Sequence, residues 1–167
     1  MARLDEFYDY KNQLMEDLLT NETIVHILKS DISMEDAESL VYEQVFPFEY
    51  VPETVQDGRT FICCDVDIQG IEPNKTFLHP VLYVWIFAHR SMLRLPEGGV
   101  TVDKLCSEVD KEINGSRKYG LGELNLYAVK RFAPMTDYQG KVMIFHAKDF
   151  NRPYDPPKDI PNNRKLG

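Results

Sequence analysis

The sequence is poor in cysteine and has no apolar run long enough to cross a membrane. Its three cysteines are the adjacent Cys63 and Cys64 and the separate Cys106, which do not form an even disulfide framework, so a reducing compartment is expected. The start of the chain lacks the basic stretch and apolar core of a secretory signal. These absences predict an intracellular protein without membrane contact.

The chain is also short of positive charge. It has 19 Lys and Arg against 27 Asp and Glu, a net charge of −8, which argues against a free-standing nucleic-acid binder. The deficit lies in residues 1–57, with 3 basic and 14 acidic residues, whereas residues 58–167 have 16 and 13. Such asymmetry is either a solvated surface or a sign that copies associate head to tail, acidic face to basic face.

Catalytic signatures are missing too. No serine lies in a Gly-x-Ser-x-Gly motif, the four histidines are unclustered, and KYGLGE lacks the third glycine of a dinucleotide fingerprint. Asp65 and Asp67 share one face of a predicted strand, which suits either carboxylate ligands of a divalent cation or plain contact with solvent. We expect no enzyme activity, no cofactor and no metal.

What the chain does have is one strongly apolar stretch, HPVLYVWIFAHR, at residues 79–90. Alternation places Val81, Tyr83, Trp85 and Phe87 on one face of a strand and Leu82, Val84, Ile86 and Ala88 on the other. Both faces are apolar, so a central strand covered on both sides is expected. Trp85→Ala is then predicted to open a cavity at the centre of the sheet.

The remaining pattern predicts an α+β fold with a small, mainly antiparallel sheet of about four strands. Helical spacing covers residues 2–19, TIVHILKS adds a turn or two, and a helix runs from Ser33 to Pro47. The sheet begins near Thr60 with TFICCDVDIQ, and the helix VDKLCSEVDKEIN separates its second strand from its third, GELNLYAVKRF, and its last, KVMIFHAKDF.

We therefore expect one domain over residues 1–150. It consists of a helical acidic segment, residues 1–46, and a sheet unit, residues 60–150. Residues 151–167 contain four prolines and no periodicity and predict an extended tail that becomes ordered only against a partner.

Two stretches are candidates for an interface. The loop Ser116–Gly122 is basic and rich in glycine, so it either touches phosphates or an acidic neighbour, or is a mobile solvated connection. The candidate side chains in this loop and in the tail are Arg117, Lys118, Tyr119, Arg152, Tyr154 and Lys158.

In its order of elements the chain resembles the head-tail joining proteins of the bacteriophage neck, of the tail-terminator and tail-completion type. The likeness covers residues 36–150 and rests on FPFEYVPETVQDGRTFICCDVDI, LYVWIFAH, VDKLCSEVDKEING, LNLYAVKRFAP and GKVMIFHAKDFN. The resemblance implies a structural virion protein that forms a ring, typically a hexamer, and terminates the tail or joins it to the head. It also implies contacts with neighbouring neck or tail proteins, passive contact with DNA in the channel, and location in the virion, or in the host cytoplasm during assembly.

Two other functions remain open from the residues. One is a small intracellular adaptor that binds a peptide or partner helix through the acidic N-terminal segment. The other is a metal-dependent nucleic-acid enzyme that uses Asp65 and Asp67.

Overall fold

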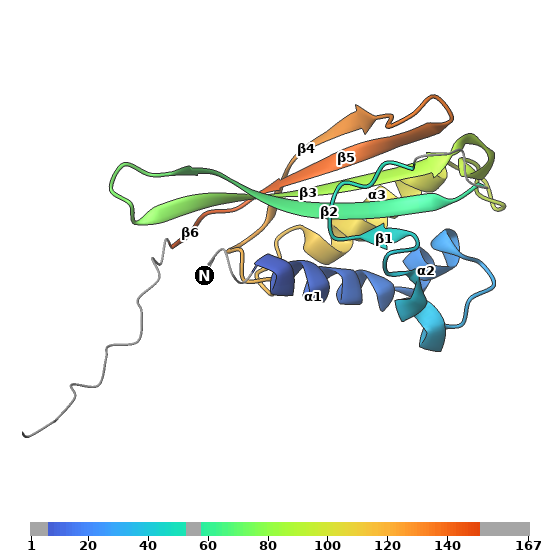
Figure 1. Cartoon of the computed structure of the whole chain (residues 1–167), viewed down its shortest axis with the longest axis horizontal. Helices are drawn as coiled ribbons and strands as arrows, with labels where there is room; N and C mark the ends of the chain where they lie inside the picture. The colour runs from blue at the N-terminus through green and yellow to red at the C-terminus, as the bar shows by residue number, and fades with distance from the viewer. Residues whose placement is uncertain (1–6, 53–57, 151–167) are drawn as a thin grey trace, which may run out of the picture.

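The computed structural model describes residues 7–52 and 58–150, which form one sheet with helices packed on one side (Figure 1). The helices are α1 (Phe7–Leu19), α2 (Glu22–Leu28), the 3₁₀ helices η2 (Met34–Leu40) and η3 (Arg90–Met92), and α3 (Thr101–Ile113). The strands are β1 (Val45–Phe46), β2 (Thr60–Ile71), β3 (Phe77–His89), β4 (Asn125–Phe132), β5 (Tyr138–His146) and β6 (Asp149–Phe150).

The sheet is mainly antiparallel, which confirms the predicted α+β class, but it has more strands than the four expected. Five strands lie in the order β1-β2-β3-β5-β4, and β6 pairs with the start of β3. The β1–β2 pair is parallel. Because β1 and β6 have two residues each, they are too short to produce a periodic pattern, and periodicity detects the four longer strands alone.

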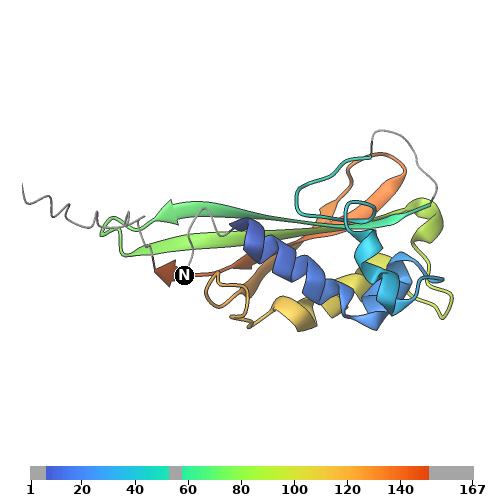
Figure 2. The same ribbon diagram turned by 60° about the horizontal axis from the view of Figure 1, so that its bottom comes forward.

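Strand β3 is central, as the sequence predicts. Trp85 pairs with Cys63 of β2 on one side and with Val142 of β5 on the other. One face of β3 is fully buried beneath α1, α2 and α3 (Figure 2), and its residues there are Leu82, Val84, Ile86 and Ala88. Full burial of one large aliphatic side chain contributes about 1.5–3 kcal/mol, so this face anchors the core.

The opposite face of the sheet is covered at one end. The cover is an aromatic cluster made of Phe46, Phe61, Phe87 and Tyr138. Trp85 packs against this cluster but is only partly buried, and it stacks on Tyr83 with the ring centroids 5.5 Å apart. The prediction that both faces are covered is therefore wrong around Trp85, because the three α-helices all pack on the other face.

The N-terminal helices match the sequence pattern as far as Leu28. Asn21 separates α1 from α2, and its side-chain Oδ1 accepts a hydrogen bond from the backbone N–H of Ile24 at 3.2 Å, which caps α2. The helix predicted from Ser33 to Pro47 is wrong in type and length, since η2 is a 3₁₀ helix that ends at Leu40. Tyr42, with φ 62°, then turns the chain into β1.

Helix α3 starts at Thr101, one residue before the predicted segment VDKLCSEVDKEIN, and ends before Asn114. Gly115 follows with φ 79°, a left-handed conformation that glycine adopts without a steric penalty at a helix C-terminus. This ending directs the chain into the loop of residues 116–122.

Candidate interaction surfaces

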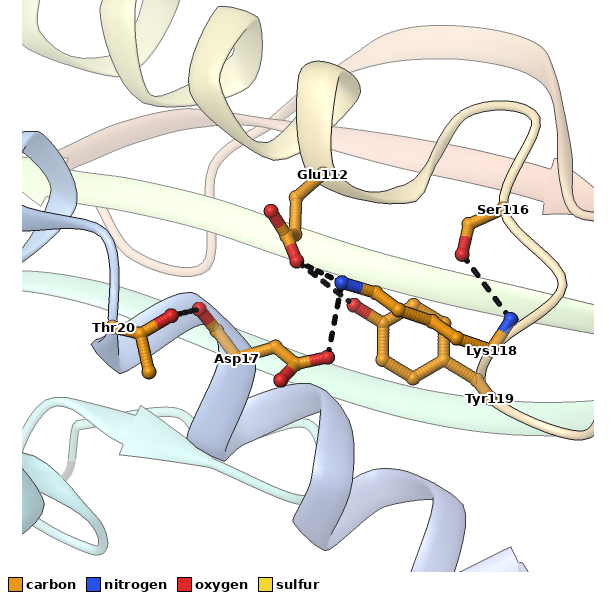
Figure 3. Close-up of polar contacts among 6 residues, drawn as sticks. All are labelled: Asp17, Thr20, Glu112, Ser116, Lys118 and Tyr119. Atoms are coloured by element: carbon orange, nitrogen blue, oxygen red, sulfur yellow. Dashed lines mark hydrogen bonds and ion pairs between the residues drawn. The ribbon is translucent and has the colours of Figure 1, made fainter.

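The loop that follows α3 is tied to two helices through Lys118 (Figure 3). The Lys118 Nζ lies 3.2 Å from the Oδ2 of Asp17 on α1, and it also forms an ion pair with Glu112 on α3. The hydrogen bond to Glu112 is the main cause of a raised pKa of Lys118, which therefore stays protonated. Lys118 joins α1, α3 and the loop within one chain.

Tyr119 is part of the core. Its side chain is 2% exposed, and its hydroxyl donates to the Oε1 of Glu112 at 3.4 Å (Figure 3). Burial, followed by the carboxylates of Asp17 and Glu112, raises the pKa of Tyr119 well above its usual value. The phenol is neutral and acts as a hydrogen-bond donor inside the fold.

Arg117 is the most exposed of the three predicted interface residues in the loop. Its guanidinium donates twice to Glu123, at 2.9 Å from Nε and 2.7 Å from a terminal nitrogen, and its side chain is 78% exposed. The structure therefore leaves Arg117 accessible and engages Lys118 and Tyr119 internally. An interface role for these residues stays a prediction. Three further candidates lie outside the described residues, namely Arg152, Tyr154 and Lys158.

The two aspartates considered as metal ligands, Asp65 and Asp67, have different surroundings. Asp65 Oδ1 lies 3.1 Å from Lys11 Nζ on α1 and also accepts from the backbone N–H of Val66 at 2.8 Å. Asp67 is exposed. Across residues 7–52 and 58–150, no group of three or more His, Cys, Asp or Glu side chains is arranged to hold a metal ion.

The three cysteines are protonated thiols at neutral pH. Burial raises the pKa of Cys63 and of Cys64 to about 12, and that of Cys106 to about 11. A thiolate is the nucleophilic and metal-binding form, so these side chains act as small apolar residues in the packing.

A groove that sequence reasoning missed runs between the start of α3 and strand β4. This β4 groove has a volume of about 840 Å³, and its lining is mostly apolar. The residues that line it include Leu93, Val100, Val102, Arg131, Phe132 and Lys141. Strand β4 forms the edge of the sheet and all eight of its residues are at least partly exposed, so the groove opens onto an unpaired strand edge.

The β4 groove carries an unneutralised positive charge. Arg131 of β4 lies directly opposite Lys141 of β5, and like charges in this position repel each other. Lys141 forms an ion pair with Asp103. Neither Arg131 nor the neighbouring Lys130 forms an ion pair with any described residue, and both are exposed.

The surface near the opposite edge of the sheet is acidic, and η2 arranges its charges in rows. Side chains three apart line up along a 3₁₀ helix, so Met34, Ala37 and Leu40 face the core while Glu35 and Glu38 form an exposed row. These two carboxylates and Glu16 of α1 line a second groove of about 610 Å³. Since η2 leads into β1, it lies at the β1 edge of the sheet, and β4 forms the other edge (Figure 1).

One signal in the sequence points to the β4 surface. The segment NLYAVKRF places apolar and charged residues on both faces of one strand, a pattern typical of an edge strand. The grooves themselves depend on which elements pack side by side and have no local signal.

These features define a small α+β protein with a positively charged groove beside edge strand β4 and an acidic groove between α1 and η2. The YomW family model matches residues 11–147, so the chain belongs to the YomW family. This family is of bacteriophage origin. No curated protein matches the chain, and no helix among the described residues has the length and apolar character needed to span a bilayer.

Proposed function

We propose that this chain is a structural virion protein of the phage neck, which assembles into a ring that terminates the tail or joins it to the head. A hexamer is the expected ring. Membership of a phage family and the resemblance of residues 36–150 to tail-terminator and tail-completion proteins support this role. The ring acts in the virion and assembles in the host cytoplasm.

The observation that carries the proposal is the opposite charge near the two edges of the sheet. Lys130 and Arg131 lie on the edge strand β4, and Glu35 and Glu38 lie on η2, which leads into the other edge strand, β1. A two-fold dimer through either edge would bring like charges together, whereas head-to-tail contacts pair opposite charges. Head-to-tail contacts between identical subunits produce rings when the rotation closes.

The proposed ring would contact other proteins of the virion. Neighbouring neck or tail proteins bind above or below the ring, and the exposed Arg117 and residues 151–167 are the candidates for these contacts. The net charge of −8 repels DNA, which suits a channel through which DNA passes without being held.

Two experiments test this function. Negative-stain images of the purified protein should show rings, and a phage with the gene disrupted should yield heads and tails that are not joined. Normal infectious particles without the protein would rule out the neck role. A monomer that is absent from particles would favour an adaptor, and a thermal shift with Mg²⁺ that is lost in Asp65→Ala would favour the metal-dependent enzyme.

A further inference from the structure

We infer that the η2 helix of one subunit docks into the β4 groove of the next, with Glu35 and Glu38 facing the positive charge of Arg131. This inference deepens the proposed function, because it rests on the ring and names the surfaces that close it. The partner that occupies the groove is therefore a second copy of this chain.

The β4 groove is suited to receive a short helix. It lies beside α3 in the helical layer, and α3 itself contacts β3 and β5. Strand β4 extends beyond this layer, so the side chains on its helix side are exposed, with Leu126 36% and Val129 44% exposed. Val100, just before α3, is 47% exposed on the other wall. A helix placed here would cover the apolar side chains that the chain's own helices leave open.

The charges inside the groove favour an acidic helix. Arg131 lies opposite Lys141 across the strand pair. Asp103 neutralises Lys141 but not Arg131. A carboxylate in the groove would remove the remaining repulsion and form a charge-assisted hydrogen bond with the guanidinium. Lys130, the next residue along the strand, points to the opposite face of the sheet and adds to the positive charge of this edge.

The η2 helix offers that pair. Its buried row holds it to the core through Ala37 and Leu40, which are 3% and 2% exposed, so the row with Glu35 and Glu38 points outward. Neither glutamate forms an ion pair with any residue of the described part of the chain. The next side chain to stand out is Tyr42, 62% exposed and with φ 62°. Its ring also contacts Phe46 and Phe48, and the exposed part of the side chain is available to a partner.

Charge reversal on each surface tests the contact. Variant A is Lys130→Glu with Arg131→Glu, and variant B is Glu35→Lys with Glu38→Lys. The matched control carries all four changes, so it keeps the wild-type net charge of −8 but exchanges the signs of the two surfaces. Circular dichroism checks that each variant folds, as expected for four exposed side chains.

Sedimentation velocity gives the readout. The wild type should associate, whereas A alone and B alone should dissociate with a constant raised about tenfold or more. An equal mixture of A and B should associate again as alternating subunits. The control that carries all four substitutions should associate by itself. Wild type that stays monomeric at about 100 µM, or a control that stays dissociated, would overturn the inference. A mixture that stops at one A–B pair would indicate a closed two-fold dimer in place of a head-to-tail ring and would also overturn the inference.

Failure of the contact and failure of the neck role give different results. If the wild type forms rings and variants A and B form the same rings, the η2–β4 contact is wrong and the ring stands. If the charge exchange behaves as expected but purified phage particles contain no trace of the protein, the contact stands and the neck role is wrong.

Discussion

The Nζ of Lys118, in the loop after α3, lies 3.2 Å from the Oδ2 of Asp17 on α1, a contact between segments far apart in the sequence. The same ammonium group binds Glu112. The lysine of the basic loop, which the sequence indicates as a candidate interface, therefore holds α1 against α3. This stabilising role within the chain can be tested separately from any role in assembly.

Replacement of Lys118 should destabilise the fold. The Oδ2 of Asp17 is a buried atom, and Lys118→Met would leave it without its cation, which should lower the free energy of unfolding by about 1–2 kcal/mol. Arg117→Met is the matched control and should cost less than about 0.5 kcal/mol, because its ion pair with Glu123 is at the surface. Urea unfolding measures both, and equal losses would contradict the clamp.

Glu108 should make stability depend on pH in acid. Hydrogen bonds from Lys111, Asn21 and Lys104 lower the pKa of Glu108 to about 2. A carboxylate whose pKa is lower in the folded state stabilises the fold above its unfolded pKa, and this contribution is lost as the pH falls from the unfolded value of about 4.3 toward 2.

The comparison of wild type with Glu108→Gln isolates this contribution. The substitution should destabilise the protein at about pH 6, and the loss should be smaller by about 1 kcal/mol at about pH 3, where wild-type Glu108 begins to lose its advantage. Chemical denaturation at the two pH values measures the difference. A penalty that is the same at both would show that the ionised carboxylate does not stabilise the fold.

Two aromatic residues on the same face of β3 should respond differently to truncation. Phe87 is 0% exposed within the aromatic cluster, so Phe87→Ala should cost about 3–5 kcal/mol. Trp85 is partly buried on the open part of the same face, and Trp85→Ala should cost about 1–2 kcal/mol, because solvent refills much of the space. Thermal unfolding measures which substitution destabilises the protein more. A larger loss of stability for Trp85→Ala would place Trp85 at a covered centre of the sheet, as the amino-acid sequence predicts.

A third pair of variants tests the close approach of β5 to β3 at Gly140. A Cβ built there would lie 2.1 Å from the carbonyl oxygen of Ile86 and 2.5 Å from the Cβ of Phe87. Gly140→Ala should therefore shift the strands apart and cost about 3 kcal/mol or more. Gly70→Ala, in β2, would meet nothing within 4 Å and should be close to neutral. Similar midpoints for the two variants in urea would contradict the predicted steric clash.

The sequence predicts the elements whose patterns are long. Strand β3 and helix α3 each have thirteen residues, so periodicity places both correctly. It misses β1, which is defined by its parallel pairing with β2 and not by its own two residues. It also mistakes η2 for an α-helix, although Met34, Ala37 and Leu40 are spaced by three, the repeat of a 3₁₀ helix.

The candidate surfaces are harder to predict because they depend on tertiary contacts. The basic pair Arg117 and Lys118 is visible in the sequence, but nothing local indicates that Asp17 and Glu112 neutralise Lys118. Conversely, Arg131 looks like any solvated cation until the register of β4 with β5 puts it opposite Lys141. The sequence identifies the charges, and the fold decides which of them remain free.

The buried amide of Gln44 has a consequence for how the chain can be divided. Its Nε2 donates to the carbonyl oxygens of Leu28, at 2.7 Å, and of Thr60, at 3.0 Å, so one side chain ties the end of α2 to the beginning of β2. A chain shortened to start at Thr60 would lose this tie and expose the apolar underside of β2 and β3 to water. The acidic N-terminal part is thus not a detachable arm, and fusion tags or foreign epitopes should be inserted in the exposed β2–β3 turn at residues 73–76 instead.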